Sequence, residues 1–126
     1  MKKNIFFILS VLIISCNSND DDITSEPIDF TGIYTGTVER SNNYPPYGFR
    51  ATIVDDKILE FKCTQPSGGV CFQGFLNITI NNDGTFTMDN GIYVFTGKIT
   101  SDFEISGTYL QYSNNFTGNF SGQLSG

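Results

Sequence analysis

The chain has 126 residues and a formal net charge of −6 at pH 7, with thirteen Asp and Glu against seven Lys and Arg. This length suits one domain, and the chain shows no basic cluster of the kind that nucleic-acid binding requires. It contains no His, which excludes Ser-His-Asp and Cys-His catalytic sites, and its Cys, Asp and Glu residues lack the spacing of a metal site. We therefore expect a non-enzymatic protein without a metal or cofactor.

The N-terminus has the features of an export signal. Lys2 and Lys3 precede an apolar run over residues 5–14, and the small residue Ser15 follows. A basic start, about ten apolar residues and a small residue at the cleavage site are typical of a secretory signal peptide, whereas a membrane span needs about 20 apolar residues. Residues 1–15 are thus predicted to be a signal peptide that is removed.

The residues around Cys16 suggest what happens after export. Ile13-Ile14-Ser15-Cys16 resembles the lipobox of bacterial lipoproteins, although an ordinary signal peptide could carry a cysteine there by chance. The resemblance implies cleavage before Cys16, a diacylglycerol on its sulfur and acylation of the new amino group. Because two or more acyl chains give stable anchoring, the membrane is an expected partner through this lipid.

Residues 16–29 are predicted to form an acidic, flexible tether. The segment is polar and cannot bury enough apolar surface to offset the entropy of ordering. Its run of Asp20, Asp21 and Asp22 resembles the surface-export signal of Bacteroidetes lipoproteins, which implies display on the outer face of the outer membrane. The alternative is a plain linker on a lipoprotein that faces the periplasm.

From residue 30 to residue 126 the sequence predicts an all-β domain. Apolar and polar residues alternate, as in half-buried antiparallel strands, and no helical period is sustained. Turn residues such as Asn82-Asp83-Gly84 and Asn90-Gly91 separate the alternating segments, so that consecutive strands should pair as a meander. The expected strands lie near 30–39, 49–55, 57–63, 70–80, 84–89, 92–100, 103–112 and 115–124.

Glycines within these strands favour an up-and-down barrel of about eight strands. Gly97, Gly107 and Gly118 fall on the same face as Phe and Tyr, so that a ring on one strand can lie over a glycine on its neighbour. Closure also removes exposed sheet edges. A two-sheet β-sandwich is the alternative, because alternation alone does not distinguish the two.

The first strand adds a resemblance in architecture. The segment FTGIYTG at residues 30–36 is similar to the opening strand of calycin barrels, the group of lipocalins, avidins and fatty-acid-binding proteins, although this chain has no Trp. The resemblance implies the barrel architecture of that group.

Cys63 and Cys71 are predicted to form a disulfide, since an exported chain keeps its cysteines in an oxidising environment. Strict alternation puts the two residues on opposite faces. A bulge near Gly74 is the expected solution.

Two modes of binding follow from the loops and the interior. Tyr44 and Tyr47, on a Pro-Pro frame between the first two strands, offer rigid contact area, and we expect them to bind a protein or glycan. The other interpretation of these two rings is that they simply cap one end of the barrel. The alternative is a small apolar ligand inside the barrel. About ten inward aromatic rings favour a filled core over a hollow one.

Overall fold

The computed structural model describes residues 25–40 and 45–126, and it is all-β apart from one short 3₁₀ turn, η1 (Tyr112–Asn114). The eight expected strands are confirmed, each end within two residues of its predicted place. They are β1 (Gly32–Arg40), β2 (Tyr47–Val54), β3 (Lys57–Thr64), β4 (Val70–Thr79), β5 (Thr85–Asp89), β6 (Tyr93–Ile99), β7 (Glu104–Gln111) and β8 (Phe116–Leu124).

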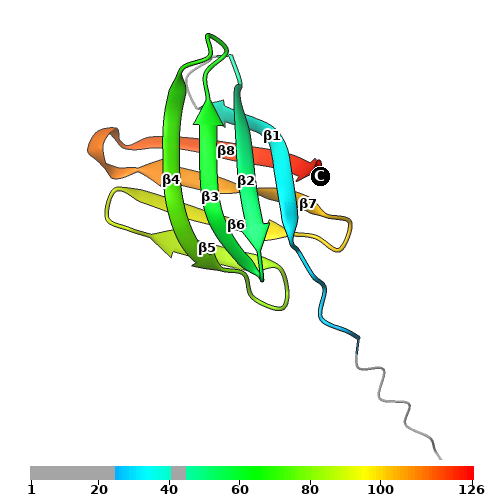
Figure 1. Cartoon of the computed structure of the whole chain (residues 1–126). Helices are drawn as coiled ribbons and strands as arrows, with labels where there is room; N and C mark the ends of the chain where they lie inside the picture. Colours follow the sequence, from blue (N-terminus) through cyan, green and yellow to red (C-terminus); the bar gives the residue numbers. More distant parts are fainter. Residues whose placement is uncertain (1–24, 41–44) are drawn as a thin grey trace, which may run out of the picture.

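The strands form one antiparallel sheet in the order β4-β3-β2-β1-β8-β7-β6-β5. The first and last strands pair with each other, and the sheet curls until the layer β1–β4 faces the layer β5–β8 (Figure 1). The predicted meander and its barrel-like curvature are confirmed. Because both layers belong to one continuous sheet, the molecule is not a sandwich of two separate sheets.

The barrel is open between β4 and β5, where a simple meander would have a further hairpin. The backbone N–H of Ile80 donates to the carbonyl of Asp56 at 2.8 Å, and that of Ile99 donates to the carbonyl of Gly84 at 2.9 Å. These bonds hold the end of β4 to the β2–β3 turn and the start of β5 to β6. The short connection therefore carries the chain from one layer to the other, and the expectation that all consecutive strands pair is wrong at this point.

Glycines and aromatic rings face each other across the strands, as the sequence predicts. Five such pairs occur in register: Gly36 with Phe49, Gly74 with Phe61, Gly97 with Phe86, Gly107 with Phe120, and Gly118 with Tyr109. In four of the pairs the missing Cβ leaves room for the paired ring, whereas at Gly74 the ring that takes this space is that of Phe72 on the same strand.

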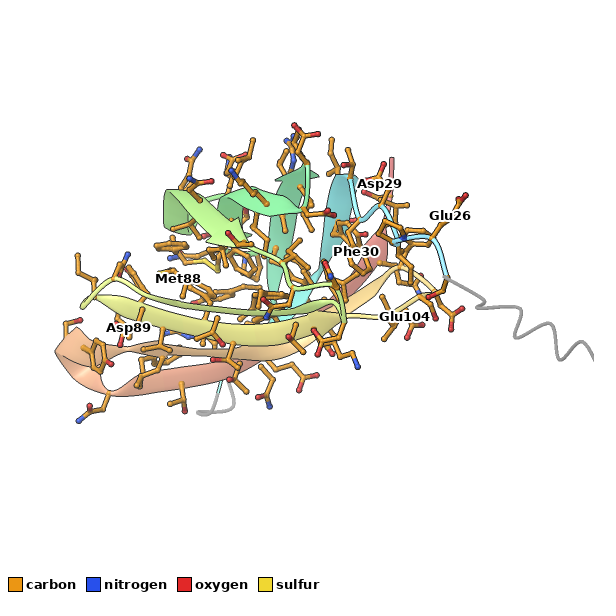
Figure 2. All side chains as sticks on the ribbon, turned by 90° about the horizontal axis from the view of Figure 1, so that it is seen from below. Glu26, Asp29, Phe30, Met88, Asp89 and Glu104 are labelled. Carbon is orange, nitrogen blue, oxygen red and sulfur yellow. A yellow bond between two sulfur atoms is a disulfide. The ribbon has the colours of Figure 1, made fainter. Side chains whose placement is uncertain are left out.

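The rings seated in this way fill the middle of the barrel. Phe61 packs 5.3 Å from Phe49, 4.8 Å from Phe95 and 5.2 Å from Phe120, measured between ring centres. All four side chains are buried, and Figure 2 shows the side chains that occupy the space between the two layers. The expected filled core is present.

Strand β4 contains two bulges, neither at Gly74. Its pairing with β3 shifts between Ile58 and Glu60 and again between Cys63 and Thr64. In the second shift Cys71 is the extra residue, because Phe72 pairs with Cys63 and Val70 with Thr64. The prediction of a bulge was right, but its place was wrong: the extra residue is the cysteine itself, and Gly74 pairs regularly with Phe61.

The two ends of the barrel differ. The chain enters β1 at the tether end, where Asp29, Phe30 and Glu104 lie, whereas Met88 and Asp89 lie at the far end (Figure 2). Phe30 is buried and plugs the tether end, and the N–H of Ile33 donates to the carbonyl of Gly126 at 2.8 Å beside it. Both described termini therefore lie at the closed end, and the β3–β4, β5–β6 and β7–β8 connections lie at the other.

Candidate binding site at the far end of the barrel

A cavity of about 210 Å³ opens at the end opposite the tether, and we call it the mouth cavity. Its walls come from the strand ends that meet there, on both layers of the sheet. The residues that line it are Val38, Arg40, Tyr47, Phe61, Cys63, Gln65, Val70, Cys71, Phe72, Tyr93, Phe95, Tyr109, Gln111 and Phe116. The barrel is therefore filled in its middle and hollow at one end.

Aromatic rings form most of the wall of the mouth cavity. The Phe72 and Tyr93 rings meet edge to face with centres 4.3 Å apart, which bridges β4 and β6 at the open side of the sheet. Tyr109 stacks on Phe95 at 6.1 Å and contacts Phe116 at 5.8 Å. Rings in such arrangements stabilise each other, and they offer faces and edges to an apolar guest.

Arg40 brings the positive charge into this aromatic wall. Its guanidinium carbon lies 3.9 Å from the centre of the Phe116 ring and 4.8 Å from that of Tyr47. One guanidinium nitrogen, Nη1, donates a hydrogen bond to the Tyr47 hydroxyl. Among the lining residues that the structure describes, Arg40 is the one with a charged side chain. Cation–π contacts with these two rings help to hold the guanidinium in place.

The Tyr109 hydroxyl keeps its proton at neutral pH. Burial raises the pKa of Tyr109, and the hydrogen bond and the positive charge of Arg40 oppose this rise. The hydroxyl is thus a neutral donor and acceptor inside the cavity.

The predicted disulfide forms part of the same wall. Cys63 and Cys71 are bonded, with their Cα atoms 5.3 Å apart, and both line the mouth cavity. Cys63 is buried and Cys71 packs against the core, so the bond pins the start of the edge strand β4 to β3. The prediction of this bridge is confirmed.

The other predicted site residues divide into two groups. Tyr47 begins β2 and lies in the mouth cavity, whereas Pro45 and Pro46 before it are exposed. Outside the described residues lie the lipidation site, the acidic export signal and the second loop tyrosine: Cys16, Asp20, Asp21, Asp22 and Tyr44.

Sequence reasoning did not single out Arg40, Tyr93 or Tyr109. A signal for Arg40 was nevertheless present, because the residue continues the inward series of Tyr34, Gly36 and Val38. A charged side chain in phase with a buried face is unusual, and it marks either a partner or a site.

Comparisons with known proteins found no family model that matches this chain and no curated protein that matches it. Within residues 25–40 and 45–126 there is no helix long and apolar enough to cross a membrane, and no group of three Cys, Asp or Glu side chains that could hold a metal ion.

Proposed function

We propose that this protein is a non-enzymatic lipoprotein of the outer membrane that binds a small, largely apolar molecule in the mouth cavity. The observation that carries the proposal is the cavity itself, an aromatic-walled hollow above a core that is otherwise filled. Apolar pockets with a few convergent polar groups are the usual form of small-molecule sites. Arg40, Tyr47 and Tyr109 are the polar groups here.

The placement of the tether supports an outward-facing site. The chain enters β1 at Gly32, and the same strand ends in the mouth cavity at Arg40. A lipid on Cys16 would therefore hold the closed end toward the membrane and turn the cavity to the outside. Extended by the charges of Asp20, Asp21 and Asp22, the tether would leave the mouth open to solvent.

A second candidate, the binding of a protein or glycan by the loops, is favoured by apolar side chains on the rim. Val70, Ile92 and Tyr112 are 50%, 56% and 45% exposed, and all three lie at the far end: Val70 begins β4, Ile92 lies between β5 and β6, and Tyr112 lies in η1. The N–H of Tyr112 donates to the carbonyl of Ile92 at 2.9 Å, so the tips of two hairpins lie together. Exposed apolar groups gathered in this way are typical of contact surfaces.

Filling the cavity distinguishes these functions. Gln111→Trp places a large ring at the cavity wall, and Gln123→Trp places the same ring on an exposed position of β8, which pairs with Glu104 at the tether end. We expect neutral single-ring compounds, detected by ligand-observed NMR, to bind the parent and Gln123→Trp but not Gln111→Trp. Equal binding to all three proteins, or to none, would contradict the proposal. Binding of a protein or glycan that is lost in Ile92→Glu but retained in Gln111→Trp would establish the second candidate instead.

A further inference from the structure

We infer that the mouth cavity takes a flat aromatic molecule, with one substituted ring or two fused rings, in preference to an aliphatic molecule of the same size. The inference rests on the proposed function and names the class of molecule that the same site binds. Three features of the cavity support it: the rings of its wall, the glycines against which two of these rings are packed, and its closed floor and small volume.

The wall combines both orientations in which aromatic rings attract each other. Phe95 is buried and lines the cavity, and its ring is the common neighbour of three other wall rings. The distances from its ring centre are 5.4 Å to Phe72, 6.2 Å to Tyr93 and 6.1 Å to Tyr109. Tyr109 stacks on Phe95, whereas Phe72 and Tyr93 meet edge to face. An aromatic guest can make the same two kinds of contact, which adds to the gain from burying apolar surface, and a saturated guest cannot.

Two of the wall rings are packed against glycines. A side-chain carbon on Gly74 would lie 2.6 Å from Cζ of Phe72, and one on Gly118 would lie 2.9 Å from Cζ of Tyr109. Both distances are too short for a carbon–carbon contact, so each ring occupies the space that the missing side chain leaves. Rings packed in this way are in place before a ligand arrives, and binding then orders few side chains. A wall of fixed flat rings favours a rigid flat guest.

The floor and the volume of the cavity limit the length of the guest. Phe61 and Phe95 are buried and line the cavity, and below them the Phe120 ring lies 5.2 Å from that of Phe61. The barrel is closed there, so a long acyl chain has no channel to enter. The cavity measures about 210 Å³, and an apolar cavity of about 150 Å³ in another protein holds benzene. The mouth cavity therefore has room for a substituted ring or for two fused rings.

Phenol, cyclohexanol and 1-hexanol test the inference, because all three are uncharged and have the same number of carbons and a single hydroxyl group. Ligand-observed NMR titrations of the purified full chain should give phenol an affinity about three- to tenfold above that of cyclohexanol. We expect 1-hexanol to bind most weakly, because a flexible chain loses torsional freedom in a rigid site. Burial of apolar surface alone would instead rank 1-hexanol first. Only the binding that Gln111→Trp abolishes is counted, which excludes molecules taken up by the lipid.

Replacing one wall ring should remove the preference. Phe72→Leu keeps an apolar side chain but loses the ring, so the advantage of phenol over cyclohexanol should fall below about twofold. The affinity for 1-hexanol should stay within about threefold of its value in the parent. The matched control is Phe103→Leu, because Phe103 also packs against the core but precedes β7 at the tether end, outside the cavity. That variant should keep the preference for phenol.

The outcomes separate the inference from the proposed function. Equal affinities for phenol and cyclohexanol in the parent, tightest binding of 1-hexanol, or an unchanged phenol preference in Phe72→Leu would overturn the inference. Each of these results leaves the proposed function standing, since Gln111→Trp still abolishes the binding. If none of the three compounds binds the parent, the inference and the proposed function are both contradicted. If Phe72→Leu does not fold, Tyr93→Leu removes the other ring of the edge-to-face pair and should reduce the preference in the same way.

Discussion

Phe120 stands directly opposite Gly107 in the β7–β8 ladder, and a side-chain carbon on Gly107 would lie 2.6 Å from Cζ of the Phe120 ring. The same carbon would lie 2.7 Å from the Cα of Gly97, which pairs with Gly107 from the other side. Both distances are too short for any carbon–carbon contact. The two glycines thus form a seat for the ring, and this seat leaves no room for a larger residue.

Gly107→Val should therefore destabilise the domain by overpacking. Such changes cost about 1–3 kcal/mol, and about 1 kcal/mol corresponds to a fall of about 4–8 °C in the melting temperature of a domain of this size. The control is Thr117→Val, an exposed position on the adjacent strand β8, where we expect little change. Thermal unfolding followed by circular dichroism measures both, and equal melting temperatures for the two variants would contradict the seating of Phe120.

Removing the disulfide should lower stability by a similar amount. Replacing both Cys63 and Cys71 with Ser frees a short loop in the unfolded chain, which costs about 2–3 kcal/mol by the chain-entropy model. Urea unfolding of the double variant should give a lower midpoint than that of the oxidised parent, and the reduced parent should match the variant. The bond itself is checked by intact mass after alkylation, and two cysteines that react without reductant would argue against it.

Alkaline pH should destabilise the protein through Tyr34. Burial, with a smaller effect of Asp29, raises the pKa of Tyr34 above its usual value, and its hydroxyl donates to the carbonyl of Phe30 at 3.1 Å. Because the folded state holds the phenol neutral, its stability contribution is complete below the unfolded pKa of about 10 and is lost as the pH rises through the folded pKa. Tyr34→Phe should therefore be less stable at pH 7 but lose less stability between pH 9 and 11. Parallel curves of unfolding free energy against pH would contradict this role.

Cys16 should carry the lipid. Mass spectrometry of the mature chain is expected to show a triacylated N-terminal cysteine, and Cys16→Ala should leave an unlipidated protein outside the membrane fraction. An unmodified Cys16 in protein taken from native membranes would remove this prediction.

Replacement of the aspartates after Cys16 tests on which side of the outer membrane the protein is displayed. Replacing Asp20, Asp21 and Asp22 with Ala should keep the lipoprotein on the periplasmic side, out of reach of protease added to whole cells. The control is replacement of Glu26 and Asp29, which removes acidic charge from the tether without touching the run of three. Unchanged accessibility in the first variant would favour the periplasmic alternative.

The sequence predicts the strands of this domain well because each strand is encoded by the alternation of apolar and polar residues along its own segment. A period of two sets which residues face inward, and for Phe30 to Val38 this period alone predicts the inward residues correctly, with no knowledge of tertiary contacts. The bulge at Cys71 and the missing β4–β5 pairing depend on how the sheet curls, which no local pattern encodes. The mouth cavity was missed for the same reason: Arg40, Tyr93 and Tyr109 come from three strands, and only the closure of β1 onto β8 brings them together.

That closure also reverses the usual distribution of local stability. In many domains the terminal strands fray first, but here β1 and β8 each have a ladder on both sides, whereas β4 and β5 each have one neighbour. Amide protons near the ends of the described chain should then be among the slowest to exchange with deuterium, and those on the free sides of β4 and β5 among the fastest. The part of the molecule that opens most readily would be a seam in the middle of the sequence. The disulfide lies at one end of that seam, and there it limits how far the edge can separate.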